Sequence, residues 1–246
     1  MPGANGPTRS RPGISLVIPV YNERDNLAIL HSELTEVMKT IGDAYEILFV
    51  NDGSTDGSDK VLRDLRAADP SVRVLALARN SGQSAAMDAG FKGAAGEVVV
   101  TLDADLQNDP ADIPRLLRAL DGWDAVVGMR QKRRDNLVRR VSSRVANYVR
   151  NRLSDETISD TGCSLKAYRR AFLSRIVLYD GMHRFLPTLL KMEGARVREV
   201  AVGHRPRRHG ESKYGIGNRL LPSFMDLLAV RWMKRRKLRY EVKDDV

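Results

Sequence analysis

Two carboxylates and an amide follow one apolar segment of the chain. The segment covers residues 98–102, and Asp103, Asp105 and Gln107 come directly after it. In domains that alternate strands and helices, substrates gather at the carboxyl ends of the strands. Mg²⁺ and Mn²⁺ prefer oxygen ligands and commonly bind one or two carboxylates together with substrate phosphates. The spacing therefore predicts a divalent cation at Asp103, Asp105 and Gln107, held against a diphosphate; a solvated loop with two aspartates is the alternative.

Two other apolar segments also end in polar turns. Residues 14–20 lead into Tyr21-Asn22-Glu23, and residues 47–50 lead into Asn51-Asp52-Gly53. Asp52 therefore stands at the end of a predicted strand. We expect Ser54 or Thr55 to cap the helix that follows.

The order of apolar segments indicates the fold class. Strand-like segments alternate with amphipathic ones over the first half of the chain. The strand-like segments are residues 14–20, 46–51, 72–78, 98–102 and 125–128, with a further candidate at residues 196–202 in the second half, and the helical ones include residues 26–41 and 57–68. This alternation predicts an α/β fold with a mostly parallel central sheet and helices on both faces.

Length and composition limit the class of protein. The chain has 246 residues, enough for one large domain, and a net charge of +10 from 41 Lys and Arg against 31 Asp and Glu. This charge predicts anionic partners without distinguishing nucleic acid, lipid headgroups and phosphorylated substrates. The single cysteine, Cys163, excludes an internal disulfide and fits a reducing compartment. With no signal-peptide pattern and no apolar stretch of about 18 residues, we expect a cytoplasmic chain without a transmembrane helix.

Taken together, these motifs resemble those of family 2 glycosyltransferases with the GT-A fold. The resemblance is to the branch of dolichol-phosphate mannose synthases and polyprenyl-phosphate glycosyltransferases. It covers residues 14–213, and residues 103–110, Asp-Ala-Asp-Leu-Gln-Asn-Asp-Pro, are similar to enzymes that load a sugar onto undecaprenyl phosphate. It implies a single GT-A (Rossmann-like) domain over residues 14–217. We expect a disordered arm before it (1–13) and a basic amphipathic helix and tail after it (218–246).

The resemblance assigns one group of residues to a nucleotide-sugar donor. Pro19, Tyr21 and Glu23 would lie against the nucleobase, and Asp52 would accept a hydrogen bond from the base or the ribose. Both GDP-mannose and UDP-sugars remain open as donors. In this scheme Asp105 belongs to the catalytic group, because the cation it helps to hold neutralises the departing nucleoside diphosphate.

The segment that begins at Arg207 resembles the R-x-x-G-x-S-K loop of the family. Arg207, Ser212 and Lys213 match that loop, and glycines nearby allow it to close on the diphosphate of a bound donor. An ordinary exposed basic loop is the alternative.

A second group of residues is assigned to the acceptor. Arg130, Arg139 and Ser143 match positions that grip the acceptor phosphate in dolichol-phosphate mannose synthases, on or beside a predicted basic helix. A lipid phosphate is already an anionic nucleophile, so it needs cations rather than a general base. Asp160 either orients the acceptor phosphate or an arginine, or serves as the base for a glycan or glycolipid hydroxyl. Arg130, Asp105 and Asp160 are therefore the predicted catalytic residues.

The segment of residues 218–240 combines apolar and basic side chains, as in a helix that lies in a bilayer interface. Packing of this helix on the domain is the alternative. We therefore expect peripheral contact with an anionic membrane surface. A non-enzymatic nucleic-acid binder is supported by charge alone, since no recognised binding motif accompanies it, and we expect no nucleic-acid partner.

Overall fold

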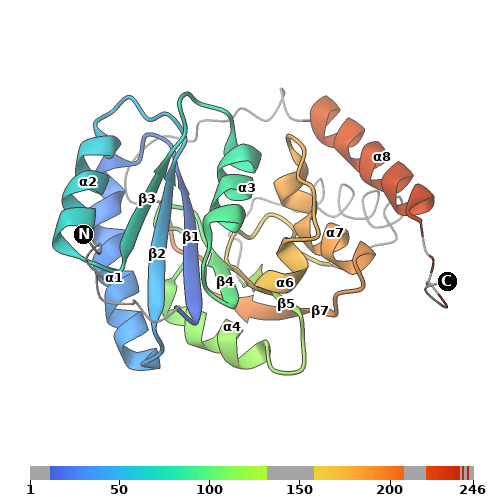
Figure 1. Ribbon diagram of the computed structural model, residues 1–246, viewed down its shortest axis with the longest axis horizontal. Coiled ribbons are helices and arrows are strands. Elements are labelled where there is room, and N and C mark those ends of the chain that lie inside the picture. Colours follow the sequence, from blue (N-terminus) through green and yellow to red (C-terminus); the bar gives the residue numbers. More distant parts are fainter. Residues whose placement is uncertain (1–11, 132–157, 208–219, 239, 241–242, 244–246) are drawn as a thin grey trace, which may run out of the picture.

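A single seven-stranded sheet forms the centre of the computed structural model, which describes residues 12–131, 158–207, 220–238, 240 and 243 (Figure 1). The strand order is β3-β2-β1-β4-β6-β5-β7. The strands are β1 (Ile14–Val20), β2 (Tyr45–Asn51), β3 (Val72–Ala76), β4 (Val98–Thr101), β5 (Ala125–Arg130), β6 (Lys166–Arg169) and β7 (Val197–Val202). All neighbours pair in parallel except β6, which is antiparallel to both β4 and β5. The predicted α/β class and mostly parallel sheet are confirmed.

Helices cover both faces of this sheet, as Figure 1 shows. The first face packs against α1 (Arg24–Ile41), α2 (Ser58–Ala68) and α4 (Ile113–Ala119). The second packs against α3 (Gln83–Gly93), α6 (Arg170–Leu173) and α7 (Leu186–Met192). The remaining helices are α8 (Leu220–Arg236) and two short 3₁₀ helices, η1 (Pro110–Asp112) and η2 (Met182–Phe185).

The first strand shows why its sequence is almost continuously apolar. Leu16 and Ile18 point into the core under α1, whereas Val17 points into the core under α3. A strand of a parallel sheet is buried on both faces, so neither face accepts polar side chains readily. This double burial produces the apolar segments that the sequence shows.

One strand was not expected from the sequence. The four residues of β6 lie in a stretch to which the sequence assigns no strand, and they insert between β4 and β5 in the opposite direction. Lys166, the first residue of β6, lies opposite Thr101, the last residue of β4. The reversed direction therefore brings the start of β6 to the edge of the sheet where β4 ends.

The prediction that Ser54 or Thr55 caps the second helix is wrong. The helix begins at Ser58, and the carboxylate of Asp56 accepts a hydrogen bond from the backbone N–H of Ser58 at 2.9 Å. The Ser54 hydroxyl instead accepts from the backbone N–H of Asn22 at 3.0 Å. Ser54 thus joins the turns after β1 and β2 to each other.

Candidate functional site

The carboxyl ends of β1, β2 and β4 meet at one edge of the sheet, and the backbone there takes an uncommon conformation. Asn22, after β1, has φ = 54°, and Leu106, after β4, has φ = 62°. Leu106 is also buried. A non-glycine residue in the left-handed region costs about 1 kcal/mol or more, and such strain concentrates at functional sites. At Leu106 this left-handed conformation turns the chain between Asp105 and Gln107.

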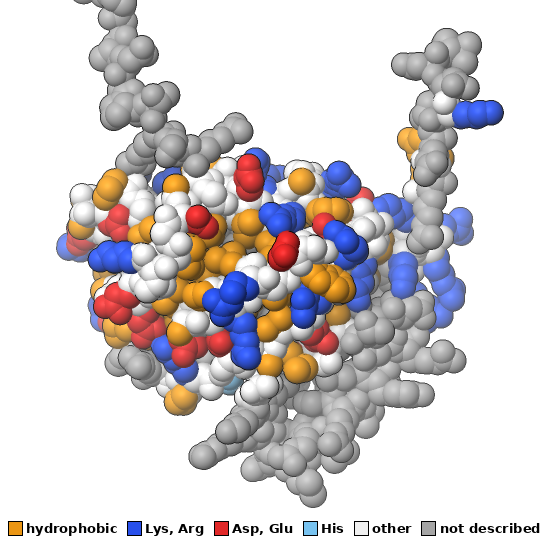
Figure 2. Space-filling view, turned by 90° about the horizontal axis from the view of Figure 1, so that it is seen from below, with side chains coloured by type: hydrophobic (Ala, Val, Ile, Leu, Met, Phe, Trp, Pro, Cys, Tyr) orange, Lys and Arg blue, Asp and Glu red, His pale blue; other side chains and the backbone are white. Residues whose placement is uncertain are grey.

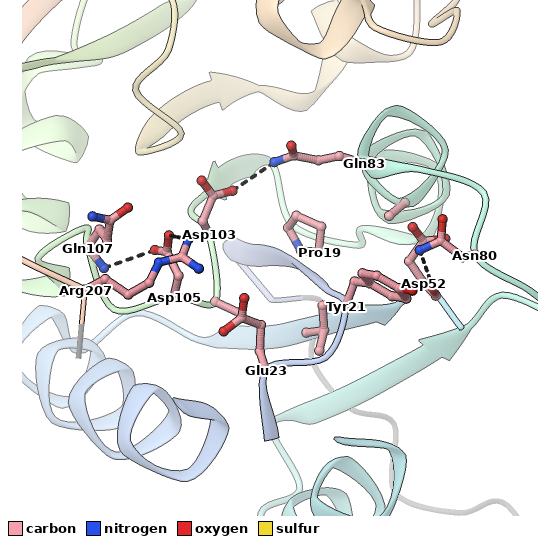
Figure 3. Close-up of a pocket in the computed structure, with 13 residues that line it drawn as sticks. Pro19, Tyr21, Glu23, Asp52, Asn80, Gln83, Asp103, Asp105, Gln107 and Arg207 are labelled. Atoms are coloured by element: carbon pink, nitrogen blue, oxygen red, sulfur yellow. Dashed lines mark hydrogen bonds and ion pairs between the residues drawn. The ribbon is translucent and has the colours of Figure 1, made fainter. Parts of the chain in front are cut away.

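A cavity of about 310 Å³ opens at this edge (Figure 3). Its walls come from the turns after β1, β2, β3 and β4, from the start of α3 and from the segment after β7. Eight of the predicted site residues line it: Pro19, Tyr21, Glu23, Asp52, Asp103, Asp105, Gln107 and Arg207. The structure therefore brings together the predicted donor residues that it describes and the predicted metal ligands.

Asp103 and Asp105, two of the three aspartates of this cavity, carry like charges at close range. Withdrawal from water and the neighbouring charge of Asp105 raise the pKa of Asp103 to about 6. The Gln83 side chain donates a hydrogen bond to Asp103 at 2.9 Å, and the Arg207 guanidinium forms an ion pair with Asp105 at 2.7 Å (Figure 3). Two carboxylates whose ionised forms repel each other favour a cation between or beside them.

Gln107 has a different place from that expected of a third ligand. Its backbone N–H donates to the Asp105 carboxylate at 3.1 Å, and Figure 3 shows its side chain on the far side of Asp105 from Asp103. Within the described residues, no group of three or more His, Cys, Asp or Glu side chains is placed to hold a metal. Gln107 lines the same cavity as Asp103 and Asp105, so its role as a third ligand stays a prediction. The two carboxylates suit a cation that takes its remaining ligands from water and phosphate.

Asp52 holds a loop at the donor end of the cavity. Its two carboxylate oxygens accept hydrogen bonds from the backbone N–H groups of Ser81 and Gly82 at 2.6 and 2.9 Å. The next residue, Gly53, has φ = 67°, and a Cβ there would lie 2.4 Å from the backbone nitrogen of Asn80. Asp52 therefore positions the start of α3. Each of its oxygens can accept a further bond, so recognition of a base stays a prediction.

Arg130 and Asp160 form a two-point ion pair beside the cavity. The Arg130 Nε and Nη2 donate to the two oxygens of Asp160 at 2.7 and 2.8 Å, and both side chains are largely buried. Asp160 also accepts from the backbone N–H of Gly162 at 3.2 Å. Of the two roles that the sequence left open for Asp160, the geometry favours the orienting of an arginine.

Three residues with a place in the site were missed in the sequence. Gln83 opens α3 and contacts Asp103. Arg205 forms ion pairs with Glu33 of α1 at 2.6 Å and with Asp109 at 2.7 Å, which ties the segment before Arg207 across the site. Their partners are 20, 172 and 96 positions away, so no local spacing pointed to them.

Lys166 is the third missed residue. It lies in the wall of a second cavity, of about 200 Å³, which shares Pro19, Gln83 and Asp103 with the first. Burial lowers the pKa of the Lys166 ammonium, and the nearby acidic side chains oppose that shift. The sequence offers no signal for Lys166, because the burial of a lysine at the start of a four-residue strand is visible only in the structure.

Four predicted site residues, Arg139, Ser143, Ser212 and Lys213, lie outside the described residues. Their roles at the acceptor phosphate and in the loop after Arg207 stay predictions. The helix expected over residues 137–153 and both domain boundaries of the prediction, which need residues 1–11 and 208–219, stay predictions for the same reason.

Fold and cavity together define the class as a GT-A type α/β domain with an acidic site at the ends of its strands. Solved structures share the fold: glucosyl-3-phosphoglycerate synthase from Mycobacterium tuberculosis, in complex with Mn²⁺, UDP and phosphoglyceric acid, superposes with a TM-score of 0.66 over 91% of this chain and 78% of that one, at 18% identity. The model of the family described as glycosyl transferase family 2 matches residues 15–177. The chain belongs to this family.

Two curated relatives are more similar in sequence. Undecaprenyl-phosphate 4-deoxy-4-formamido-L-arabinose transferase from Aeromonas hydrophila is 42% identical over 205 residues, which cover 82% of this chain and 63% of the relative. Dodecaprenyl-phosphate galacturonate synthase from Rhizobium johnstonii is 38% identical over 243 residues, 96% of this chain and 71% of the relative. The chain thus spans about 63% of the length of the arabinose transferase.

Proposed function

We propose that this chain is an inverting glycosyltransferase that moves a sugar from a nucleoside-diphosphate donor to the phosphate of a polyprenyl lipid. The observation that carries the proposal is the joining of two cavities at Asp103: one is lined by the predicted donor residues, the other by Lys166 and Arg184. Both relatives described above are named for a polyprenyl phosphate, which supports the acceptor class.

The donor half of the reaction needs binding and orientation. The faces of Pro19 and Tyr21 offer packing surface to a base, and the open lone pairs of Asp52 accept from its N–H groups. Arg207 lies where the departing diphosphate would develop charge, and its guanidinium can bind two phosphate oxygens at once. These residues hold the donor with its diphosphate directed at the acidic turn.

Asp103 and Asp105 fit a divalent cation, because they place two repelling carboxylates in one cavity wall. When bound there, Mg²⁺ or Mn²⁺ would supply Lewis-acid stabilisation of the leaving nucleoside diphosphate. Arg207 forms an ion pair with Asp105, and a cation that balances the charge of Asp105 would let Arg207 exchange this pair for phosphate oxygens.

The acceptor half of the reaction needs cations and no base. A phosphate monoester is an anion near neutral pH, so attack on the anomeric carbon requires only its positioning. Arg130, fixed by Asp160, contributes positive charge beside the second cavity. The competing function, transfer to a hydroxyl with Asp160 as base, has less support because both of its oxygens already accept from Arg130.

We also propose that α8 makes the peripheral membrane contact. Leu227 and Val230 of α8 are buried against η2 and α7, so one side of this helix packs on the domain. Met225 and Trp232 on the opposite side are exposed, and so is Phe224. The helix ends in Lys234, Arg235 and Arg236, and Figure 2 shows basic side chains gathered at this end of the molecule. In the described residues no helix is both long and apolar enough to cross a membrane.

Release of nucleoside diphosphate tests the main proposal. Purified chain with Mn²⁺ and each of GDP-mannose, UDP-glucose and UDP-N-acetylglucosamine should release the diphosphate only when a short polyprenyl phosphate is present. The matched control is the corresponding polyprenol, which lacks the phosphate and should give no release. Equal release with free glycans would favour the hydroxyl acceptor and contradict the proposal.

A further inference from the structure

The Lys166 side chain is a buried cation with few partners. It is 3% exposed, and its one hydrogen bond within the described residues is a long one, 3.5 Å, to the backbone carbonyl of Thr161. In the same part of the chain, no carboxylate lies within ion-pair distance of it. An ammonium has three N–H donors, so most of its hydrogen-bonding capacity is unused. A buried charge with so few hydrogen bonds costs free energy unless a ligand supplies the missing acceptors.

Lys166 lies in a cavity wall where it can contact a bound substrate. It lines the second cavity, whose other walls include Ser164, His183 and Arg184. The His183 ring is held by a 2.7 Å hydrogen bond with Ser84, so this wall is fixed to α3. Because the cavity shares Asp103 with the donor cavity, a group bound in it would lie next to the bound donor.

The charges around this second cavity leave a place for an anion. Asp160 is balanced by Arg130 through two hydrogen bonds. Asp103 is the carboxylate in the wall of this cavity, and it accepts a hydrogen bond from Gln83. Asp226 of α8 lies near Arg184 and interacts with its charge. Lys166 and Arg184 therefore present two cations to one cavity, whose described walls add one carboxylate, that of Asp103.

We propose that Lys166 binds an oxyanion of a substrate in the second cavity. The group is either the phosphate of the acceptor or a carboxylate on the transferred sugar, since both offer anionic oxygens to an ammonium. The choice between these sources rests on the proposed function, whereas the oxyanion site itself does not. The acceptor residues predicted from the sequence are Arg130, Arg139 and Ser143, and Lys166 is not among them.

The first test separates a ligand-binding lysine from a structural one. Lys166→Met keeps the length of the side chain and removes the unsatisfied charge. We expect its melting temperature to equal or exceed that of the wild type, because the buried ammonium is poorly compensated without ligand. A clear fall in melting temperature together with unchanged ligand constants would show a structural role and overturn the proposal.

The second test identifies the oxyanion by kinetics. With farnesyl phosphate as acceptor, Lys166→Met should raise the KM for that acceptor about tenfold or more and leave the KM of a neutral-sugar donor unchanged. If the sugar carboxylate is the ligand, the KM of a UDP-uronic acid should rise instead. Lys60→Met, an exposed lysine of α2, is the matched control. Unchanged KM values for both substrates would refute the proposal.

A direct binding measurement tests this inference independently of the proposed function. Isothermal titration with sodium phosphate and with farnesyl phosphate needs no turnover. Binding by the wild type that Lys166→Met loses would support the site even if no transfer activity is found. Transfer activity with equal phosphate binding in both proteins would support the function and overturn the site. If Lys166→Met does not fold, Lys166→Arg, which keeps the charge but moves it, should weaken the same binding, and unaltered binding would count against the proposal.

Discussion

At the scale of single residues, Asp105 contributes through its charge. It lies 2.7 Å from Arg207 and raises the pKa of Asp103. Asp105→Asn keeps the shape and removes the charge, so we expect kcat for diphosphate release to fall at least about 100-fold. Excess EDTA should likewise stop the wild type.

The control for this variant is Asp121→Asn, which changes an exposed carboxylate in a turn far from the cavity and should retain full activity. Full turnover by Asp105→Asn, or by the wild type in excess EDTA, would remove the role of Asp105 as a metal ligand. Measurement of initial rates at saturating donor distinguishes these outcomes from weak donor binding.

Cys163 gives a second prediction at this scale. Burial raises the pKa of its thiol to about 11, and its side chain is 1% exposed. At pH 8 only about a thousandth of it is thiolate, the form that reacts. Iodoacetamide should therefore label the native protein very slowly and the urea-unfolded protein quickly, as mass spectrometry would show. Fast labelling of the native protein would contradict the burial.

The sequence predicted residue types at strand ends better than it predicted their partners. Asp52, Asp103 and Asp105 were found because each follows an apolar segment. The pair of Arg130 with Asp160 joins residues 30 positions apart, and local spacing does not specify such a contact. Lys166 was missed because the start of a short strand has no periodicity of its own.

At the scale of elements, a polar network joins the amino ends of three strands. Glu46 of β2 is buried and accepts from the Ser15 hydroxyl at 2.5 Å, from the backbone N–H of Ala95 at 2.7 Å and from Arg73 at 2.5 Å. Glu46→Ala would leave the Ser15 hydroxyl and the Ala95 N–H without this acceptor, and would leave Arg73 with the Gly93 carbonyl at 3.0 Å. We expect it to lower the free energy of unfolding by about 2–4 kcal/mol.

Urea unfolding followed by circular dichroism measures this loss. The matched control is Glu97→Ala, which removes an exposed glutamate just before β4 and should change stability by less than about 0.5 kcal/mol. Equal midpoints for the two variants would show that the network around Glu46 adds little.

The strands on the first half of the sheet were predictable because both of their faces are buried. The bounds of β1 agree with residues 14–20, and those of β2 and β3 differ by one or two residues. β6 was not predictable in the same way. It has four residues, and Lys166 at its start is charged, so it lacks the continuous apolar segment that marked the others.

At the scale of the whole molecule, α8 would determine how the domain meets a bilayer. Trp232 is 64% exposed on the side of α8 that faces away from the core. Trp232→Ser should weaken sedimentation with vesicles that contain phosphatidylglycerol. Arg235→Glu should weaken it about fivefold or more at low salt, since each cation near an anionic surface contributes about 1 kcal/mol.

Lys60→Glu makes the same charge change on α2, which lies at the opposite end of the molecule from α8 (Figure 1), and should leave vesicle binding nearly unaltered. If all three variants bind as the wild type does, α8 is a packing helix only. An equal loss of vesicle binding in Lys60→Glu and Arg235→Glu would instead indicate that the net charge of the protein attracts the membrane and that no particular face binds it.

The insertion of β6 between β4 and β5 also makes the two halves of the chain depend on each other. A polypeptide that stops after β5 would have no neighbour for the inner edge of β4, and its exposed backbone N–H and C=O groups would invite pairing with other chains. Separate expression of the fragments before and after residue 150 should therefore yield aggregates, whereas co-expression should restore a folded pair.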